Sequence, residues 1–113
     1  MKLDDFQKRA MEFDLYKITK DLNDTAFLEK VLGLVGEAGE TADKIKKIIR
    51  DKGGRADDND ISAIKKELGD VLWYVANVAR YLDITLDDVA KCNIEKLSSR
   101  KDRHELHGEG DDR

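Results

Sequence analysis

Apolar residues recur along most of the chain at the three- and four-residue intervals that give an α-helix one apolar face. Together with capping residues at the helix ends, these intervals predict four helices, at about residues 4–22, 25–50, 61–82 and 85–100. Proline is absent and aromatic residues make up only 6% of the chain, which disfavours a loop-rich β-sandwich. The sequence therefore predicts an all-α, four-helix bundle-like fold.

Each of the two central helices carries an apolar stripe beside a polar row. In the third helix the stripe is predicted to be core, and it comprises Ile61, Ile64, Leu68, Val71, Leu72, Val75, Val78, Ala79 and Leu82. The row beside it comprises Glu67, Asp70, Tyr74, Asn77 and Tyr81. In the second helix the apolar face comprises Phe27, Val31, Val35, Ala38, Ala42, Ile45 and Ile49. One flank of that helix carries Glu37, Glu40, Lys44 and Lys47.

Two stretches interrupt the helical pattern. Residues 51–60 contain Gly53 and Gly54, which predict a helix stop, and Asn59 or Asp60 is the predicted cap of the third helix. This stretch is either an ordered active-site loop or a mobile connection. The tail from about residue 104 has no helical pattern. Because no internal repeat is visible, residues 1–113 are predicted to form a single domain.

The charge of the chain limits the classes of partner that it is expected to bind. Charged residues make up 41% of the sequence, and 25 Asp and Glu against 21 Lys and Arg give a formal charge of −4. An acidic chain without a basic block is a poor candidate for binding nucleic acid. The single cysteine fits a reducing compartment, and no apolar run approaches the roughly 18 residues of a membrane span. We expect a cytoplasmic protein that binds neither nucleic acid nor a membrane.

Two acidic motifs carry the main chemical signal. Glu37 and Glu40 form E-x-x-E in the second helix, and Glu67 and Asp70 form E-x-x-D in the third. The three-residue spacing places both carboxylates of a motif on adjacent turns of one face. If the helices are antiparallel, all four carboxylates converge and repel one another unless a cation intervenes; oxygen ligands alone favour Mg²⁺ or Mn²⁺ over zinc. The alternative is that these residues form ordinary solvated helix faces.

Glycines accompany both motifs, although glycine in a helix interior costs about 1 kcal/mol relative to alanine. The four positions are Gly33, Gly36, Gly39 and Gly69. They suggest close backbone approach, room for a ligand or tight helix packing.

The fourth helix carries a row of hydrogen-bond donors, namely Asn93, Lys96, Arg100 and Arg103. If this row faced the acidic motifs, it would supply donors to phosphate oxygens. The alternative is a cationic helix end that complements the helix dipole. Trp73 projects away from both rows of the third helix, which indicates either stacking on a base or burial at a subunit interface.

Three segments containing these motifs, residues 33–47, 65–79 and 93–113, resemble the MazG-type nucleotide pyrophosphohydrolases. The resemblance extends from about residue 28 to the end of the chain. It implies an all-α NTP pyrophosphatase fold that hydrolyses a (d)NTP between its α- and β-phosphates with Mg²⁺, which yields a (d)NMP and pyrophosphate. The implied role is removal of unwanted or modified nucleotides from the pool.

The resemblance also assigns roles to individual residues. The implied metal-site residues are Glu37, Glu40, Glu67 and Asp70. The implied substrate-binding residues are Tyr74, beside the triphosphate, and the phosphate-binding set Asn93, Lys96 and Arg100. We take Glu37 as the residue that orients or deprotonates the attacking water, and Lys96 and Arg100 as the residues that stabilise the leaving pyrophosphate.

Two further expectations concern assembly and alternatives. Four amphipathic helices bury little core in one short chain, so we expect a homo-oligomer, a dimer or a tetramer. A non-catalytic helical interaction module with an acidic, cation-binding face is the alternative from another class. A relative selective for dUTP, dCTP or phosphoribosyl-ATP is the alternative within the superfamily.

Overall fold

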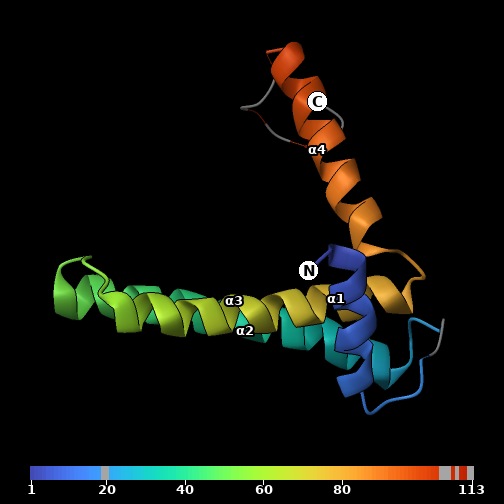
Figure 1. Cartoon of the computed structure of the whole chain (residues 1–113), viewed down its shortest axis with the longest axis horizontal. Helices are drawn as coiled ribbons and strands as arrows, with labels where there is room; N and C mark the ends of the chain where they lie inside the picture. The colour runs from blue at the N-terminus through green and yellow to red at the C-terminus, as the bar shows by residue number, and fades with distance from the viewer. Residues whose placement is uncertain (19–20, 105–107, 109, 112–113) are drawn as a thin grey trace.

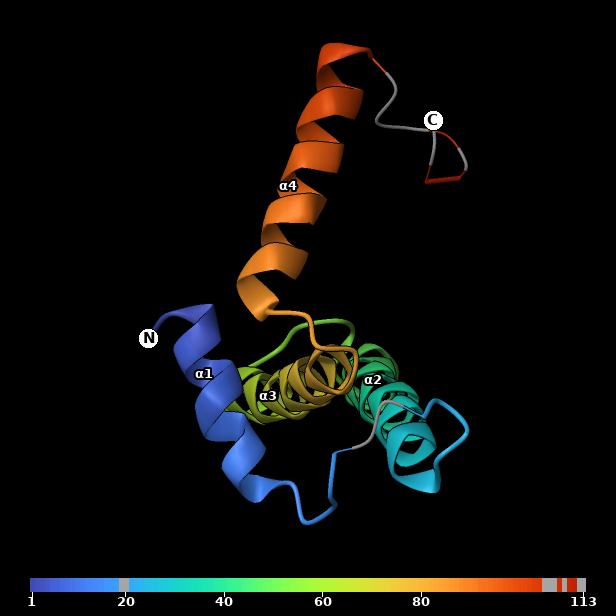
Figure 2. The same ribbon diagram turned by 90° about the vertical axis from the view of Figure 1, so that its right-hand side faces the viewer.

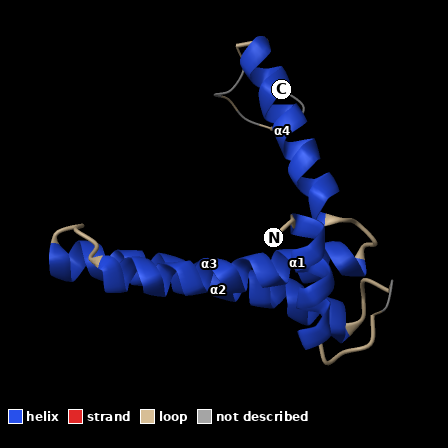
Figure 3. Ribbon diagram, viewed as in Figure 1, coloured by secondary structure: helices blue, strands red, loops and turns tan. Residues whose placement is uncertain are grey.

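The computed structural model describes residues 1–18, 21–104, 108 and 110–111, and the regular secondary structure among them is helical, with no strand (Figure 3). The helices are α1 (Leu3–Ala10), the short 3₁₀ helix η1 (Met11–Phe13), α2 (Thr25–Lys52), α3 (Asp58–Tyr81) and α4 (Leu86–Asp102). The predicted all-α class is confirmed. Within the described part of the chain, no helix combines the length and apolar character needed to cross a bilayer.

Helices α2 and α3 form a long antiparallel hairpin (Figures 1 and 2). At 28 and 24 residues, they are about 42 and 36 Å long at the usual rise per residue. Three contacts define their register. The rings of Phe27 and Tyr81 lie 6.1 Å apart. The ring of Tyr74 lies against Gly33. Lys44 pairs with Glu67 further along.

The connection between α2 and α3 is shorter than predicted. Gly53 ends α2 in the left-handed conformation, with φ +60°. Asp57 caps α3 and forms a reciprocal capping box with Asp60, so α3 begins before both predicted cap residues. Lys52 then binds both acids, at 2.9 Å to Asp57 and 2.7 Å to Asp60. The predicted break within residues 51–60 is therefore confirmed but narrower, at residues 53–57, because α2 continues to Lys52 and the capping box starts α3 at Asp58.

The first helix also ends earlier than predicted. Instead of continuing to residue 22, α1 ends at Ala10 and is followed by η1 and an irregular segment. The chain turns at Asp14, whose backbone is extended. The Asp14 carboxylate accepts a hydrogen bond from the Tyr81 hydroxyl at 2.8 Å and lies 3.0 Å from the Lys30 amine. These contacts, made with α2 and α3, replace the helical continuation that local periodicity favours.

Lys30 is the centre of a buried polar cluster with Asp14 and Tyr81. The side chains of Lys30 and Asp14 are each only 2% exposed. The Lys30 amine also lies over the rings of Tyr16 and Trp73, at 4.7 and 5.6 Å from their centroids. Burial raises the pKa of Asp14, but hydrogen bonds from Tyr16 N–H, Tyr81 and Lys30 outweigh it and lower that pKa. This cluster holds the N-terminal segment on the hairpin.

Helix α1 crosses α3 near the corner where the chain passes into α4, and Gln7 makes the central contacts there (Figure 2). The buried Gln7 amide donates to Ala76 O at 3.3 Å and to Ile84 O at 3.0 Å. Its oxygen accepts from the N–H of Leu86 at 3.2 Å. One side chain of α1 thereby joins the end of α3 to the start of α4.

Further side chains complete the cap of α4. Asp4 of α1 accepts from the N–H of Asp87 at 3.0 Å. Thr85, where the fourth helix was predicted to start, caps it by accepting from the N–H of Asp88 at 3.1 Å. With the Gln7 contact, three successive N–H groups of the first turn have side-chain acceptors.

Small residues form the core at this crossing. The buried apolar residues that pack together there are Ala10, Ala76, Ala79 and Leu86. Trp73 packs against them, and its indole N–H donates to Ala10 O at 3.1 Å. Within the chain the indole therefore binds α1, and the two sequence-based interpretations of Trp73, base stacking and burial at a subunit interface, stay predictions.

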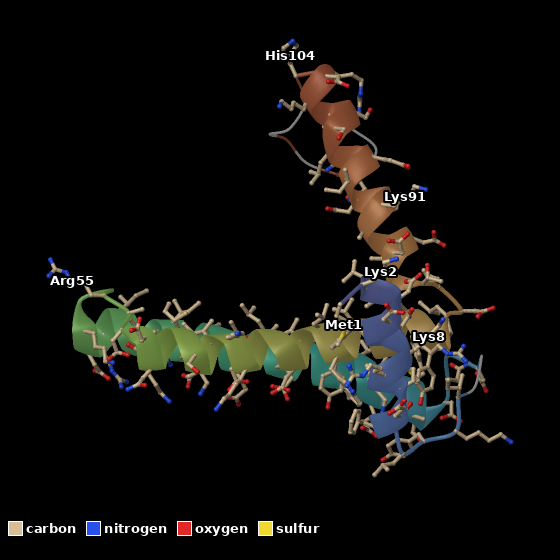
Figure 4. All side chains as sticks on the ribbon, viewed as in Figure 1. Met1, Lys2, Lys8, Arg55, Lys91 and His104 are labelled. Carbon is tan, nitrogen blue, oxygen red and sulfur yellow. The ribbon has the colours of Figure 1, made fainter. Side chains whose placement is uncertain are left out.

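Helix α4 projects away from the hairpin, and the chain is therefore extended (Figures 1 and 4). Its radius of gyration is 16.9 Å, against about 13 Å for a compact chain of this length. Predicted core residues of α3 are exposed, namely Ile61, Leu68, Leu72 and Leu82. The prediction that they form core within one chain is wrong. The cause is the hairpin itself, which packs largely through the polar flanks of α2 and α3 and leaves much of their apolar stripes outside.

The buried ion pair yields a stability prediction. Lys30→Met leaves the buried Asp14 carboxylate without its counterion and should lower the free energy of unfolding by about 3 kcal/mol. The pKa of Asp14 is lowered from its ordinary value of 3.8, so the ion pair stabilises the folded protein fully at pH values above 3.8. This stabilisation is lost as the pH falls through the lowered pKa. The deficit of Lys30→Met in urea unfolding should therefore shrink below about pH 4.

Lys46→Met is the matched control for this measurement. Lys46 is 69% exposed and pairs with Asp43 at the surface, so its replacement should change the unfolding free energy by less than about 1 kcal/mol. Equal effects of the two substitutions would contradict the role assigned to the buried pair.

Candidate functional site

Three of the four predicted metal-site carboxylates converge between α2 and α3. Oxygen atoms of Glu37, Glu67 and Asp70 all lie within 4.8 Å of one another. Glu37 comes from α2, and the E-x-x-D spacing brings both acids of α3 to the same side of that helix. Glu40 is exposed and lies outside this group of three, one turn further along α2.

The electrostatics of the cluster reflect mutual repulsion. The pKa of Glu37 is raised, first by partial burial and then by the negative charges of Asp70 and Glu67. Glu40 also raises the pKa of Glu37, so it acts on the cluster through its charge. One cation opposes this repulsion: the amine of Lys44 lies 3.3 Å from a Glu67 oxygen.

The donor set of the cluster suits a hard divalent cation. Its three ligands are all carboxylates; Glu37 and Glu67 are half-buried, and Asp70 is exposed. Mg²⁺ binds through one or two carboxylates while it keeps several waters and contacts substrate phosphates. An open cluster of three carboxylates suits this coordination of Mg²⁺, whereas zinc is usually bound by histidine or cysteine.

Tyr74 lies one turn after Asp70, at the α1 end of the cluster. Its ring lies so close to Gly33 that a Cβ at position 33 would overlap it. The same ring meets Trp73 edge-on, with centroids 4.9 Å apart. Close approach therefore explains one of the four helical glycines.

The other three glycines have a different environment. A Cβ built at Gly36, Gly39 or Gly69 meets nothing within 4 Å. All three positions are exposed in this chain. Packing within the chain therefore does not account for them.

The structure does not bring the predicted phosphate-binding residues to the acidic cluster of the same chain. Asn93, Lys96 and Arg100 lie on α4, which leaves the hairpin at its corner (Figure 1). Arg100 is about 21 Å along that helix from its first residue.

Lys96 and Arg100 bind the C-terminal tail instead. The Lys96 amine lies 3.1 Å from an Asp111 carboxylate oxygen. Arg100 donates to the main-chain oxygens of Asp111 and Gly110, at 2.8 and 3.2 Å, and is only 3% exposed. Both side chains thus already hold oxygen acceptors, which is the chemistry that phosphate binding requires. The predicted irregular tail otherwise falls partly on residues 105–107, 109 and 112–113, which lie outside the described part of the chain.

Sequence reasoning missed two features of this region. The Lys44–Glu67 pair joins two helices, although the shared face of Lys44 and Glu40 pointed instead to a pair within α2. The contact of Asp111 with Lys96 and Arg100 could not be predicted from the sequence, because no periodic pattern links the tail to α4.

Comparisons with known proteins support the resemblance that the order of the acidic motifs indicates. The chain matches the MazG nucleotide pyrophosphohydrolase domain family over residues 26–104, which includes α3, α4 and all of α2 except its first residue. It is also similar to the Gene 37 protein of Mycobacterium phage L5, with 45% identity over 114 residues that cover the whole of both chains. No solved structure matches the chain. The two acidic motifs thus occur within the matched region, and the chain belongs to the MazG nucleotide pyrophosphohydrolase domain family.

Proposed function

We propose that the protein is an Mg²⁺-dependent hydrolase that cleaves nucleoside triphosphates between the α- and β-phosphates and releases a (d)NMP and pyrophosphate. The observation that carries the proposal is the convergence of Glu37, Glu67 and Asp70 between two helices of a chain in this family. The proposed role is removal of unwanted nucleotides in the reducing cytoplasm.

In this proposal Glu37, Glu67 and Asp70 hold the cation, and Glu40 adds negative charge one turn away. When bound, Mg²⁺ supplies charge neutralisation for the phosphate oxygens and polarises the reacting phosphorus. The chain itself supplies the ordered carboxylates and the Tyr74 ring, which closes the α1 end of the site.

Glu37 is the proposed general base. Its carboxylate lies within the cation-binding cluster, where it can orient a water molecule beside the bound phosphate and accept its proton. It takes a proton from water as the water oxygen bonds to phosphorus. The bond from that phosphorus to the α–β bridging oxygen breaks, and the bridging oxygen leaves with its electron pair.

We further propose that the active unit is a homodimer or homotetramer in which one chain presents α4 to the acidic cluster of another. Two observations support this. Parts of the apolar stripes of α2 and α3 are exposed, with Val35 and Leu68 at 67% and 53%. Asn93, Lys96 and Arg100 lie on a helix directed away from their own cluster. A second copy accounts for both, and for the open space at Gly36, Gly39 and Gly69.

Product analysis tests the chemistry. With Mg²⁺ and the four standard ribo- and deoxyribonucleoside triphosphates, plus several modified ones, at least one substrate should yield pyrophosphate and nucleoside monophosphate in equal amounts. Orthophosphate as the first product would place cleavage at another bond and reject the assignment. No product from any triphosphate would favour the helical interaction module.

Asp70→Asn tests the cation site. The substitution should lower turnover at least about a hundredfold, because the site loses an anionic ligand. In metal-free buffer its melting temperature should stay unchanged or rise, since carboxylate repulsion is relieved. The stabilisation that Mg²⁺ gives the wild type should shrink in the variant. Glu12→Gln, an exposed acid outside the cluster, is the control and should change none of these values.

Subunit mixing tests the shared site. Light scattering should give at least a dimer, and Asp70→Asn and Arg100→Ala should each be inactive alone. After they are mixed and reassorted, activity should return to about a quarter of wild type, because half of the dimers are mixed and each mixed dimer has one intact site of two. A monomer, or a mixture without recovery, would contradict the shared site.

A further inference from the structure

The hairpin contains a cavity of about 230 Å³ beside the acidic cluster, on the side away from Tyr74. It is lined by Lys44, Lys47, Ile48, Asp51, Lys52, Asp60 and Ala63. Along α3, Asp60, Ala63, Glu67 and Asp70 follow one another at three- and four-residue steps, so cavity and cluster share one helix face. Lys44 belongs to both, because it lines the cavity and contacts Glu67. The two sites are therefore neighbouring parts of one groove.

The cavity suits a small anion in size and charge. Three lysines and two aspartates line it, so its lining is cationic, in contrast to the acidic cluster next to it. Its volume is several times the roughly 30 Å³ that one water molecule occupies in the liquid. The small side chain of Ala63 leaves this space open on the α3 side.

The three lysines of the cavity pair with different carboxylates. Lys47 lies 2.7 Å from Asp43, and Lys52 lies 2.7 Å from Asp60. Both of these aspartates lie outside the acidic cluster. Lys44 instead pairs with Glu67, which is one of the three cluster carboxylates. A divalent cation at the cluster would compete with Lys44 for that carboxylate and repel its amine. The Lys44 side chain is 36% exposed, so it has room to turn toward the cavity.

We propose that this cavity binds the β,γ-diphosphate of the nucleoside triphosphate, and pyrophosphate after cleavage, and that Lys44 moves from Glu67 to the diphosphate when the cation binds. This proposal rests on the proposed function and adds the orientation in which the triphosphate binds. The diphosphate points toward the α2–α3 connection, and the nucleoside points toward Tyr74. Lys44 then stabilises the negative charge that grows on the leaving group.

Calorimetric titration of the purified full-length protein tests the proposal with two probes, Mg²⁺ alone and inorganic pyrophosphate in the presence of Mg²⁺. Lys44→Gln should bind Mg²⁺ more tightly than the wild type, because Glu67 is no longer shared. The same variant should bind pyrophosphate about tenfold more weakly, since a charge-assisted hydrogen bond is lost. Opposite changes in the two affinities are not expected from general damage to the fold.

Two further variants sharpen the result. Lys46→Gln removes a lysine of the same helix that does not line the cavity, and it should leave both affinities at wild-type values. Ala63→Leu fills the cavity and should weaken pyrophosphate binding while leaving the affinity for Mg²⁺ alone unchanged. Circular dichroism melting of each variant confirms that it is folded.

The outcomes separate this proposal from the proposed function. Wild-type affinity for pyrophosphate in both Lys44→Gln and Ala63→Leu would overturn the cavity assignment, and so would a wild-type protein that does not bind pyrophosphate. If triphosphates are still cleaved to pyrophosphate in either case, the proposed function stands. If pyrophosphate binds through Lys44 but no triphosphate is cleaved, the function fails and the binding cavity remains.

Discussion

The structure depends on which faces of α2 and α3 meet. Each of these helices has an apolar stripe and a polar flank, and the hairpin packs them through the polar flanks. Contacts such as Tyr74 on Gly33 and Lys44 with Glu67 lie in this interface, together with the acidic cluster. Much of each apolar stripe remains on the outside, where Leu68 and Val35 are exposed. A single chain therefore builds a polar groove between the helices and leaves part of its apolar surface exposed.

Placing three carboxylates in this groove has an energetic consequence. Partial burial and like charges at such short range both destabilise the ionised state of the cluster, and together they raise the pKa of Glu37. The hairpin tolerates this because its two helices are long and are held at both ends. Lys30 and Asp14 anchor the N-terminal segment at one end, and Lys52 with its two aspartates fixes the connection at the other. The repulsion is thus confined to the middle, where a cation can relieve it.

Local signals predicted those parts of the fold that depend on local chemistry. The start of α2 at Thr25 and the Thr85 cap of α4 follow from capping residues, and the convergence of Glu37 with the E-x-x-D motif follows from helix periodicity. The early end of α1 did not, because Asp14 finds its partners on α2 and α3, far away in the sequence. Periodicity identifies an apolar face but not the element that covers it. For this reason the apolar stripe of α3 was assigned to a core that one chain does not build.

The contacts of α1 at the corner between α3 and α4 have a consequence for how the molecule evolves and can be redesigned. Gln7 and Asp4 bind the first turn of α4, so the direction of α4 is set by side chains about 80 positions upstream. These residues precede the region that matches the family, residues 26–104. Substitutions in the first ten residues can therefore change the direction in which α4 leaves the hairpin, while the acidic motifs stay the same. The direction of α4 can thus differ among related chains whose acidic motifs are identical, because it depends on contacts with the N-terminal helix.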